Sequence, residues 1–185
     1  MCVVIAIVSW VAMSLAQETA VPVNVQFPLF LKILTFDRHL KTRVGGEIVI
    51  GIVYQRKFRT SLNVKDEFVN VAGTSSIKTI DGIPIRCVPI EIDDETDLAN
   101  AVSKNRVNLL YVTPVRAVDV EVITAVSRAK QVMTFTGVPD YVESGLSIGI
   151  GIKGEKPLII VNLAAAKAEG TDFSSQLLKL AKIIE

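Results

Sequence analysis

The residues best suited to holding a small molecule follow the ends of apolar runs. In an open parallel sheet, ligands bind outside the carboxyl ends of the strands. The side chains at these ends are hydroxyls and guanidinium groups, and a hydroxyl beside a helix N-terminus suits a small anionic or polar ligand. Ordinary helix caps and loop arginines are the competing interpretation. The candidate cleft residues are Tyr54, Arg56, Thr113, Arg116 and Thr136.

The pairs of residues on which common catalytic mechanisms depend are missing from this sequence. The single histidine, His39, lies between Arg38 and Lys41, and it forms no Ser-His-Asp or Cys-His arrangement. The acidic run 91–97 lacks the glycine and the oxygen spacing of an EF-hand, and it suits the first turn of a helix. We therefore expect no enzyme, no metal site and no cofactor. A cofactor-free enzyme that uses Tyr54, Arg56 and a carboxylate is the remaining catalytic alternative.

A glycine motif at 149–154 matches the G-x-G-x-x-G pattern of dinucleotide-binding loops. Such a loop needs a strand before it and a helix opening after it. Here the glycines lie within an apolar strand, and Pro157 leads into another strand. Alternating glycines instead predict a bare patch on one sheet face, where another segment packs closely.

Composition favours one folded domain that does not bind nucleic acid. The chain has 185 residues, of which 50% are hydrophobic and 21% charged, so it can bury a core. Lys and Arg number 20 against 19 acidic residues, so the basic excess of a nucleic-acid binder is absent.

The first sixteen residues have the pattern of a signal peptide. An uncharged apolar run ends in Ser14-Leu15-Ala16, in which Ser14 and Ala16 are small residues at the positions that a signal peptidase reads. The run is shorter than the roughly 20 residues that span a bilayer. We expect cleavage after Ala16, a mature domain over 17–185, and no direct membrane insertion of that domain.

Cys87 is then the single cysteine of the mature chain, so no disulfide within the chain can form. It lies inside an alternating apolar run, which suits a buried small hydrophobe. A disulfide between two chains of a dimer is the alternative.

From Ile48 onward, apolar runs alternate with helical segments, which predicts a parallel sheet with right-handed crossovers. The expected fold is α/β, with an open, mainly parallel sheet flanked by helices, a C-terminal β-hairpin and two closing helices. We expect strands at 48–54, 83–92, 107–112, 132–135, 146–152 and 158–161. We expect helices at 28–40, 62–71, 93–105, 118–130, 140–143, 162–170 and 177–184.

The first helix has more apolar residues than one face can hide, and such an excess often marks a surface that binds a partner. The alternatives are that the sheet buries all of them, or that they form a homodimer. The candidate residues are Phe27, Phe30, Leu31 and Leu34.

The C-terminal block resembles the YfiR/HmsC-like family. It begins at 161–166 and runs through Gly170 to a final Leu-rich segment, and the run 30–33 with Asp37 is similar to that family's opening helix. The family-motif residues are Asn162, Gly170, Ser174, Ser175, Leu177 and Leu180.

This resemblance implies a periplasmic regulator that binds the periplasmic region of an inner-membrane signalling protein. The best-understood relatives restrain a diguanylate cyclase, and so limit cyclic-di-GMP signalling and biofilm formation. Redox-controlled members use cysteine pairs, from which this chain departs because Cys87 is alone after cleavage. The alternative function is a small periplasmic solute-binding protein that uses the strand-end cleft.

Overall fold

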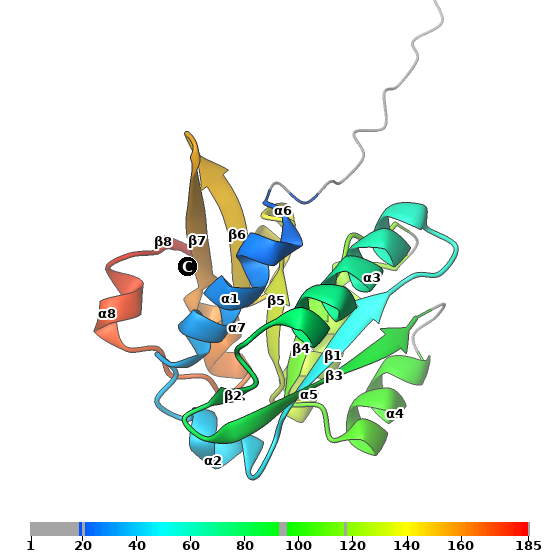
Figure 1. Cartoon of the computed structure of the whole chain (residues 1–185), viewed down its shortest axis with the longest axis horizontal. Coiled ribbons are helices and arrows are strands. Elements are labelled where there is room, and N and C mark those ends of the chain that lie inside the picture. Colours follow the sequence, from blue (N-terminus) through cyan, green and yellow to red (C-terminus); the bar gives the residue numbers. More distant parts are fainter. Residues whose placement is uncertain (1–18, 20, 93–95, 117, 185) are drawn as a thin grey trace, which may run out of the picture.

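The computed structural model describes residues 19, 21–92, 96–116 and 118–184. Within this part of the chain, one eight-stranded sheet has the order β2-β3-β1-β4-β5-β6-β7-β8 (Figure 1). The strands are β1 (Ile48–Tyr54), β2 (Thr79–Ile80), β3 (Ile83–Glu91), β4 (Leu109–Val112), β5 (Met133–Thr136), β6 (Ile148–Lys153), β7 (Lys156–Asn162) and β8 (Lys182–Ile184).

The strands from β3 to β6 pair in parallel, and β7 returns antiparallel to β6 as a hairpin. Every residue of β1, β4 and β5 is buried. Continuous burial is expected because helices cover both faces of a parallel sheet. The predicted open, mainly parallel α/β sheet with a late hairpin is confirmed.

Helices lie on both faces of this sheet. The helices are α1 (Val23–Leu34), α2 (Leu40–Val44), α3 (Arg59–Thr74), α4 (Thr96–Asn105), α5 (Val120–Lys130), α6 (Asp140–Glu143), α7 (Leu163–Ala168) and α8 (Ser175–Leu178). One apolar core joins α1 and α3 to the sheet, and a second core joins α4, α5 and α6 to its opposite face. Figure 1 shows α1 and α3 in front of the strands. No helix within the described ranges is long and apolar enough to cross a membrane.

An aromatic cluster fixes α1 against the sheet. The ring of Phe30 lies 4.8 Å from that of Phe135, and the ring of Phe27 lies 5.3 Å from that of Phe68. The four α1 residues expected on a partner surface, Phe27, Phe30, Leu31 and Leu34, are at most 3% exposed. That expectation is wrong, because the sheet and α3 together bury more of α1 than one helical face.

The alternating glycines of β6 let α6 and the residue before it pack closely on the strand. A Cβ atom on Gly149 would lie 2.5 Å from Cγ2 of Val142, and one on Gly151 would lie 3.2 Å from Cγ of Pro139. The predicted close packing on a bare strand face is therefore confirmed. Gly154 has a φ of +63° and forms the hairpin turn with Glu155.

The two ends of the chain differ from the expected helices. The helix predicted at 28–40 is split, since α1 ends at Leu34 and α2 begins at Leu40. The helix predicted at 177–184 is wrong after its first turn, because residues 182–184 form β8, parallel to β7. The unpaired backbone edge of β7 offers Ile183 and Ile184 ladder hydrogen bonds that outweigh their local helical pattern.

Replacing Leu177 by alanine should lower the free energy of unfolding by about 2–5 kcal/mol, because the side chain is deeply buried. Leu177 is 1% exposed and belongs to the core beneath α1, whereas Leu180 is 68% exposed. Urea unfolding of the mature chain measures the loss, with Leu180→Ala as the matched control, for which we expect less than about 0.5 kcal/mol. Equal losses in the two variants would contradict a core position for α8.

Candidate functional site

The carboxyl ends of β1 and β4 lie at the switch point of the sheet. The chain passes from β1 to β3 on one side and then crosses back to β4 on the other. Ligands of open α/β sheets bind in the crevice at such a point. Tyr54 ends β1, and Thr113 directly follows β4, so sequence reasoning placed these two candidates at the expected edge.

Side chains of the protein itself fill this crevice. The hydroxyls of Ser61 and Thr113 are 2.6 Å apart, and the backbone N–H of Gln55 donates to Oγ of Ser61 at 2.8 Å. Thr113 also donates to the carbonyl of Val53 at 2.8 Å, and it is 0% exposed. These groups are satisfied internally, so Thr113 is not presented to a ligand.

Thr136 is closed off in the same way. Its hydroxyl donates to the carbonyl of Val112 at 3.0 Å and accepts from the backbone N–H of Val138 at 3.0 Å. Beside it, a Cβ atom on Gly137 would lie 2.5 Å from Nε2 of Gln26. The buried Gln26 therefore packs on the bare backbone at this end of β5, where the sequence predicted a ligand.

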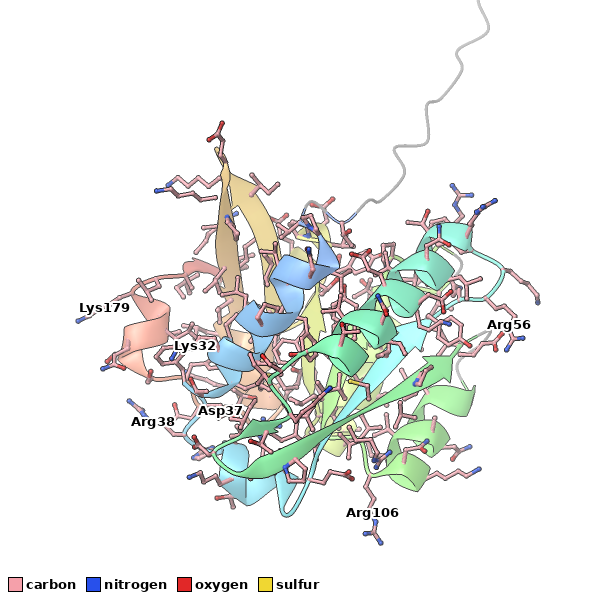
Figure 2. The ribbon with its side chains drawn as sticks, viewed as in Figure 1. Lys32, Asp37, Arg38, Arg56, Arg106 and Lys179 are labelled. Atoms are coloured by element: carbon pink, nitrogen blue, oxygen red, sulfur yellow. The ribbon has the colours of Figure 1, made fainter. Side chains whose placement is uncertain are left out.

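Arg56 and Tyr54 do converge on a carboxylate, that of Glu91 at the end of β3. The guanidinium of Arg56 donates through Nε at 2.9 Å and Nη2 at 2.6 Å, and the Tyr54 hydroxyl donates at 3.4 Å. These hydrogen bonds, above all those from Arg56, hold the pKa of Glu91 below its ordinary value. Glu91 is therefore ionised at neutral pH, and Figure 2 shows Arg56 at the outer surface rather than in a cleft.

Arg116 lines a hollow near the strand ends. Its guanidinium lies 5.1 Å from the ring of Phe58, and the hollow has a volume of about 260 Å³. Asp119, Glu121 and Asp140 also line it, so carboxylates outnumber the guanidinium. This charge balance suits a ligand that carries an amine. Of the anionic or polar ligands expected at the strand ends, it therefore disfavours the anionic ones at this place.

Sequence reasoning did not identify the role of Asp37, a buried carboxylate between α1 and α2. Its Oδ2 accepts from Nη2 of Arg43 at 2.7 Å, and its Oδ1 accepts from the backbone N–H groups of His39 and Asp172. The side chain of Asp37 is 0% exposed and that of Arg43 is 11% exposed. Asp37 therefore joins the opening helices to the C-terminal segment, and its presence in the family resemblance was the signal for this role.

Glu169, directly after α7, is a second buried carboxylate that sequence reasoning missed. It accepts hydrogen bonds from the hydroxyls of Ser127, Thr134 and Ser147, and from the backbone N–H of Thr134 at 2.9 Å. Burial raises its pKa, and these hydrogen bonds oppose that rise. Glu169 thus links α5, β5 and the residue before β6 to the end of α7, and no ion pair joins it to a cation of the described ranges.

The family-motif residues cap or end the helices of the C-terminal segment. Asn162 caps α7, because its Oδ1 accepts from the backbone N–H of Ala165 at 2.9 Å. Gly170 has a φ of +77°, a conformation that favours glycine. Ser174 occupies the N-cap position of α8, and Ser175 is its first residue. These residues therefore cap and end helices in the C-terminal segment.

Cys87 is a free thiol, half-buried on β3. Burial raises its pKa to about 11. The interpretations as a small apolar residue and as a cysteine that pairs between chains both stay open. Among the described residues, no group of three His, Cys, Asp or Glu side chains is placed to hold a metal ion.

The fold resembles those of several solved proteins. A conserved domain protein from Vibrio cholerae O1 biovar El Tor is 14% identical with a TM-score of 0.60, covering 89% of this chain and 60% of that one. The ABC domain in complex with L-Trp from Streptococcus pneumoniae is also 14% identical, with a TM-score of 0.60 and coverages of 88% and 60%. A ligand-free, open substrate-binding protein with adhesive properties from Clostridium difficile is 17% identical, with a TM-score of 0.54 and coverages of 80% and 57%.

These likenesses show the fold alone, and this chain spans about 60% of the length of the first two structures. No curated protein matches the chain in sequence. The family model that does match is described as YfiR/HmsC-like, and it covers residues 40–182. That range runs from α2 to the start of β8 and takes in most of the chain. This protein therefore belongs to the YfiR/HmsC-like family.

Proposed function

We propose that this protein binds the periplasmic part of an inner-membrane diguanylate cyclase and restrains its output, without transforming a small molecule. The family match over residues 40–182 is the observation that carries this proposal. The state of the strand-end residues supports it. The hydroxyls of Thr113 and Thr136 donate to backbone carbonyls, and Arg56 forms an ion pair with Glu91, so these groups already have partners within the protein.

The proposal requires export, with cleavage after Ala16. Residues 1–18 lie outside the described part of the chain, so this step rests on the sequence pattern. N-terminal sequencing of the native protein should give a mature chain that begins at Gln17. A mature protein that begins at Met1 and fractionates with the cytosol would contradict export.

Deletion of the gene should raise cellular cyclic-di-GMP, and the purified mature chain should capture the cyclase from a membrane extract. Because Phe30 is 3% exposed, a charged substitution there would unfold the protein rather than test binding. The capture experiment instead uses Ile152→Asp and Leu180→Asp, because these apolar side chains are 51% and 68% exposed and can be charged without entering the core. Unchanged cyclic-di-GMP in the deletion strain would contradict the proposal.

Solute binding is the second candidate, and the hollow beside Arg116 favours it. Two of the solved proteins of similar fold are described as an L-Trp complex and as a substrate-binding protein. An amine-bearing solute would meet Asp119 and Asp140, and Arg116 would meet its acidic group. Tight binding of such a solute, lost in Arg116→Gln, together with unchanged cyclic-di-GMP in the deletion strain, would favour this second function.

A further inference from the structure

A second polar hollow lies at the other end of the strands, beside the amino ends of β4 and β5. Its volume is about 300 Å³. Among the described residues that line it, three are cationic and none is acidic. We name it the basic hollow, and its polar lining consists of Arg43, Ser103, Arg106, Asn108, Lys130 and Gln131.

Arg43 brings a fixed guanidinium to the basic hollow. Its Nη2 donates to Asp37 at 2.7 Å, and its Nη1 donates to the carbonyl of Asn108 at 3.5 Å. Its Nε is buried and has no hydrogen-bond partner within the described residues. A buried donor without a partner is uncommon in folded proteins, and a bound anion is one way to satisfy it.

Arg106 and Gln131 stand at positions where glycine would be more favourable. They follow the last residues of α4 and α5, and their φ angles are +54° and +51°. A side chain in this left-handed region costs about 1–2 kcal/mol, from which glycine is exempt. Both side chains line the basic hollow. Glycine at these two positions would leave the hollow without the guanidinium of Arg106 and the amide of Gln131.

The helix dipoles account for only part of this arrangement. Cations are favoured at helix C-termini, which suits Lys130 at the end of α5 and Arg106 after α4. The dipole does not explain the buried Nε of Arg43, which comes from α2. It also does not explain Gln131, which carries no charge.

We propose that the basic hollow binds a phosphate group. Guanidinium groups present paired donors that match phosphate oxygens. Asp37 compensates the charge of Arg43, so Arg106 and Lys130 supply the net positive charge of the hollow. Figure 2 shows Arg106 extending outward at the edge of the fold, whereas the side chain of Arg43 is only 11% exposed. The phosphate belongs either to a free small molecule or to a lipid headgroup. This inference does not depend on the identity of the membrane partner.

Inorganic phosphate is the probe for this site. It is titrated into the ¹⁵N-labelled mature chain at low ionic strength, because salt screens exposed charges. We expect saturable amide shifts at 103–108 and 130–132, and none with chloride at equal ionic strength. Arg106→Gln should weaken binding about tenfold or more. Lys104→Gln is the matched control, since Lys104 lies in the last turn of the same helix and does not line the hollow.

The variant Arg106→Gly distinguishes a role of Arg106 in phosphate binding from a role in ending α4. It relieves the left-handed strain, so we expect an unchanged or higher Tm together with weaker phosphate binding. If the mature chain co-sediments with phosphatidylglycerol vesicles and Arg106→Gln does not, the phosphate belongs to a lipid headgroup. If the chain binds inorganic phosphate but not the vesicles, the phosphate belongs to a small molecule. The proposal fails if neither probe binds, or if Lys104→Gln weakens binding as much as Arg106→Gln does.

Discussion

Substitution of Asp37 by alanine is expected to lower the free energy of unfolding by about 3–5 kcal/mol. The change leaves the guanidinium of Arg43, which is 11% exposed, without its carboxylate partner. It also removes the acceptor of two backbone N–H groups, those of His39 and Asp172. Breaking a buried ion pair by deleting one partner is far more harmful than replacing both, because a buried charge remains uncompensated.

Urea unfolding of the mature chain measures this loss. The neighbouring pair of Arg38 and Asp172 provides the control, since its side chains are 58% and 46% exposed. Asp172→Ala should cost less than about 1 kcal/mol, because water screens an exposed pair. A loss of similar size in the two variants would show that the buried bridge does not hold the two ends of the chain together.

The second large effect is expected at Glu169. Glu169→Ala should destabilise the protein by about 2–5 kcal/mol, because buried donors lose their acceptor. Those donors include the backbone N–H of Thr134 and the hydroxyls of Ser127 and Ser147. Glu169→Gln keeps the shape and one acceptor oxygen, and the hydroxyls can rotate to accept from its amide. We therefore expect a clearly smaller loss in the glutamine variant.

The same residue should give stability a pH dependence. Burial raises the folded-state pKa of Glu169 above its ordinary 4.5, so the folded chain binds this proton more tightly than the unfolded chain does. The resulting stability is fully present below pH 4.5 and is lost as the pH rises through the folded-state pKa. Unfolding curves collected across this range should show the decline in the natural protein and not in Glu169→Gln. An identical pH profile in both would contradict a raised pKa.

Local pattern alone identified much of the sheet. Every residue of β1 is apolar except its Tyr54 tip and Gly51, and the predicted bounds 48–54 match the structure. A strand buried on both faces needs such a run, wherever its neighbours lie. The glycines at 149 and 151 likewise predicted a bare strand face, because the absence of a Cβ atom is a local property.

Tertiary contacts decided the ends of the chain and the exposure of α1. The apolar residues at 177–184 suit a helix, yet the last of them pair with β7, because an open strand edge competes with local propensity. The four apolar residues of α1 suggested a partner surface, yet they lie in the core. A helix sequence shows which side chains are apolar, but how much of its circumference is covered depends on the elements that surround it.

The candidate site shows the same division. The sequence placed Tyr54, Arg56 and Thr113 at strand ends, which order along the chain suffices to predict. It did not reveal that Glu91 neutralises Arg56 or that Ser61 closes the space beside Thr113. Nor did it reveal that Asp37 and Glu169 are buried, since acidic residues in loops are usually exposed. Whether a polar group faces a ligand or is satisfied within the protein depends on neighbours distant in sequence, and only the folded chain brings those neighbours together.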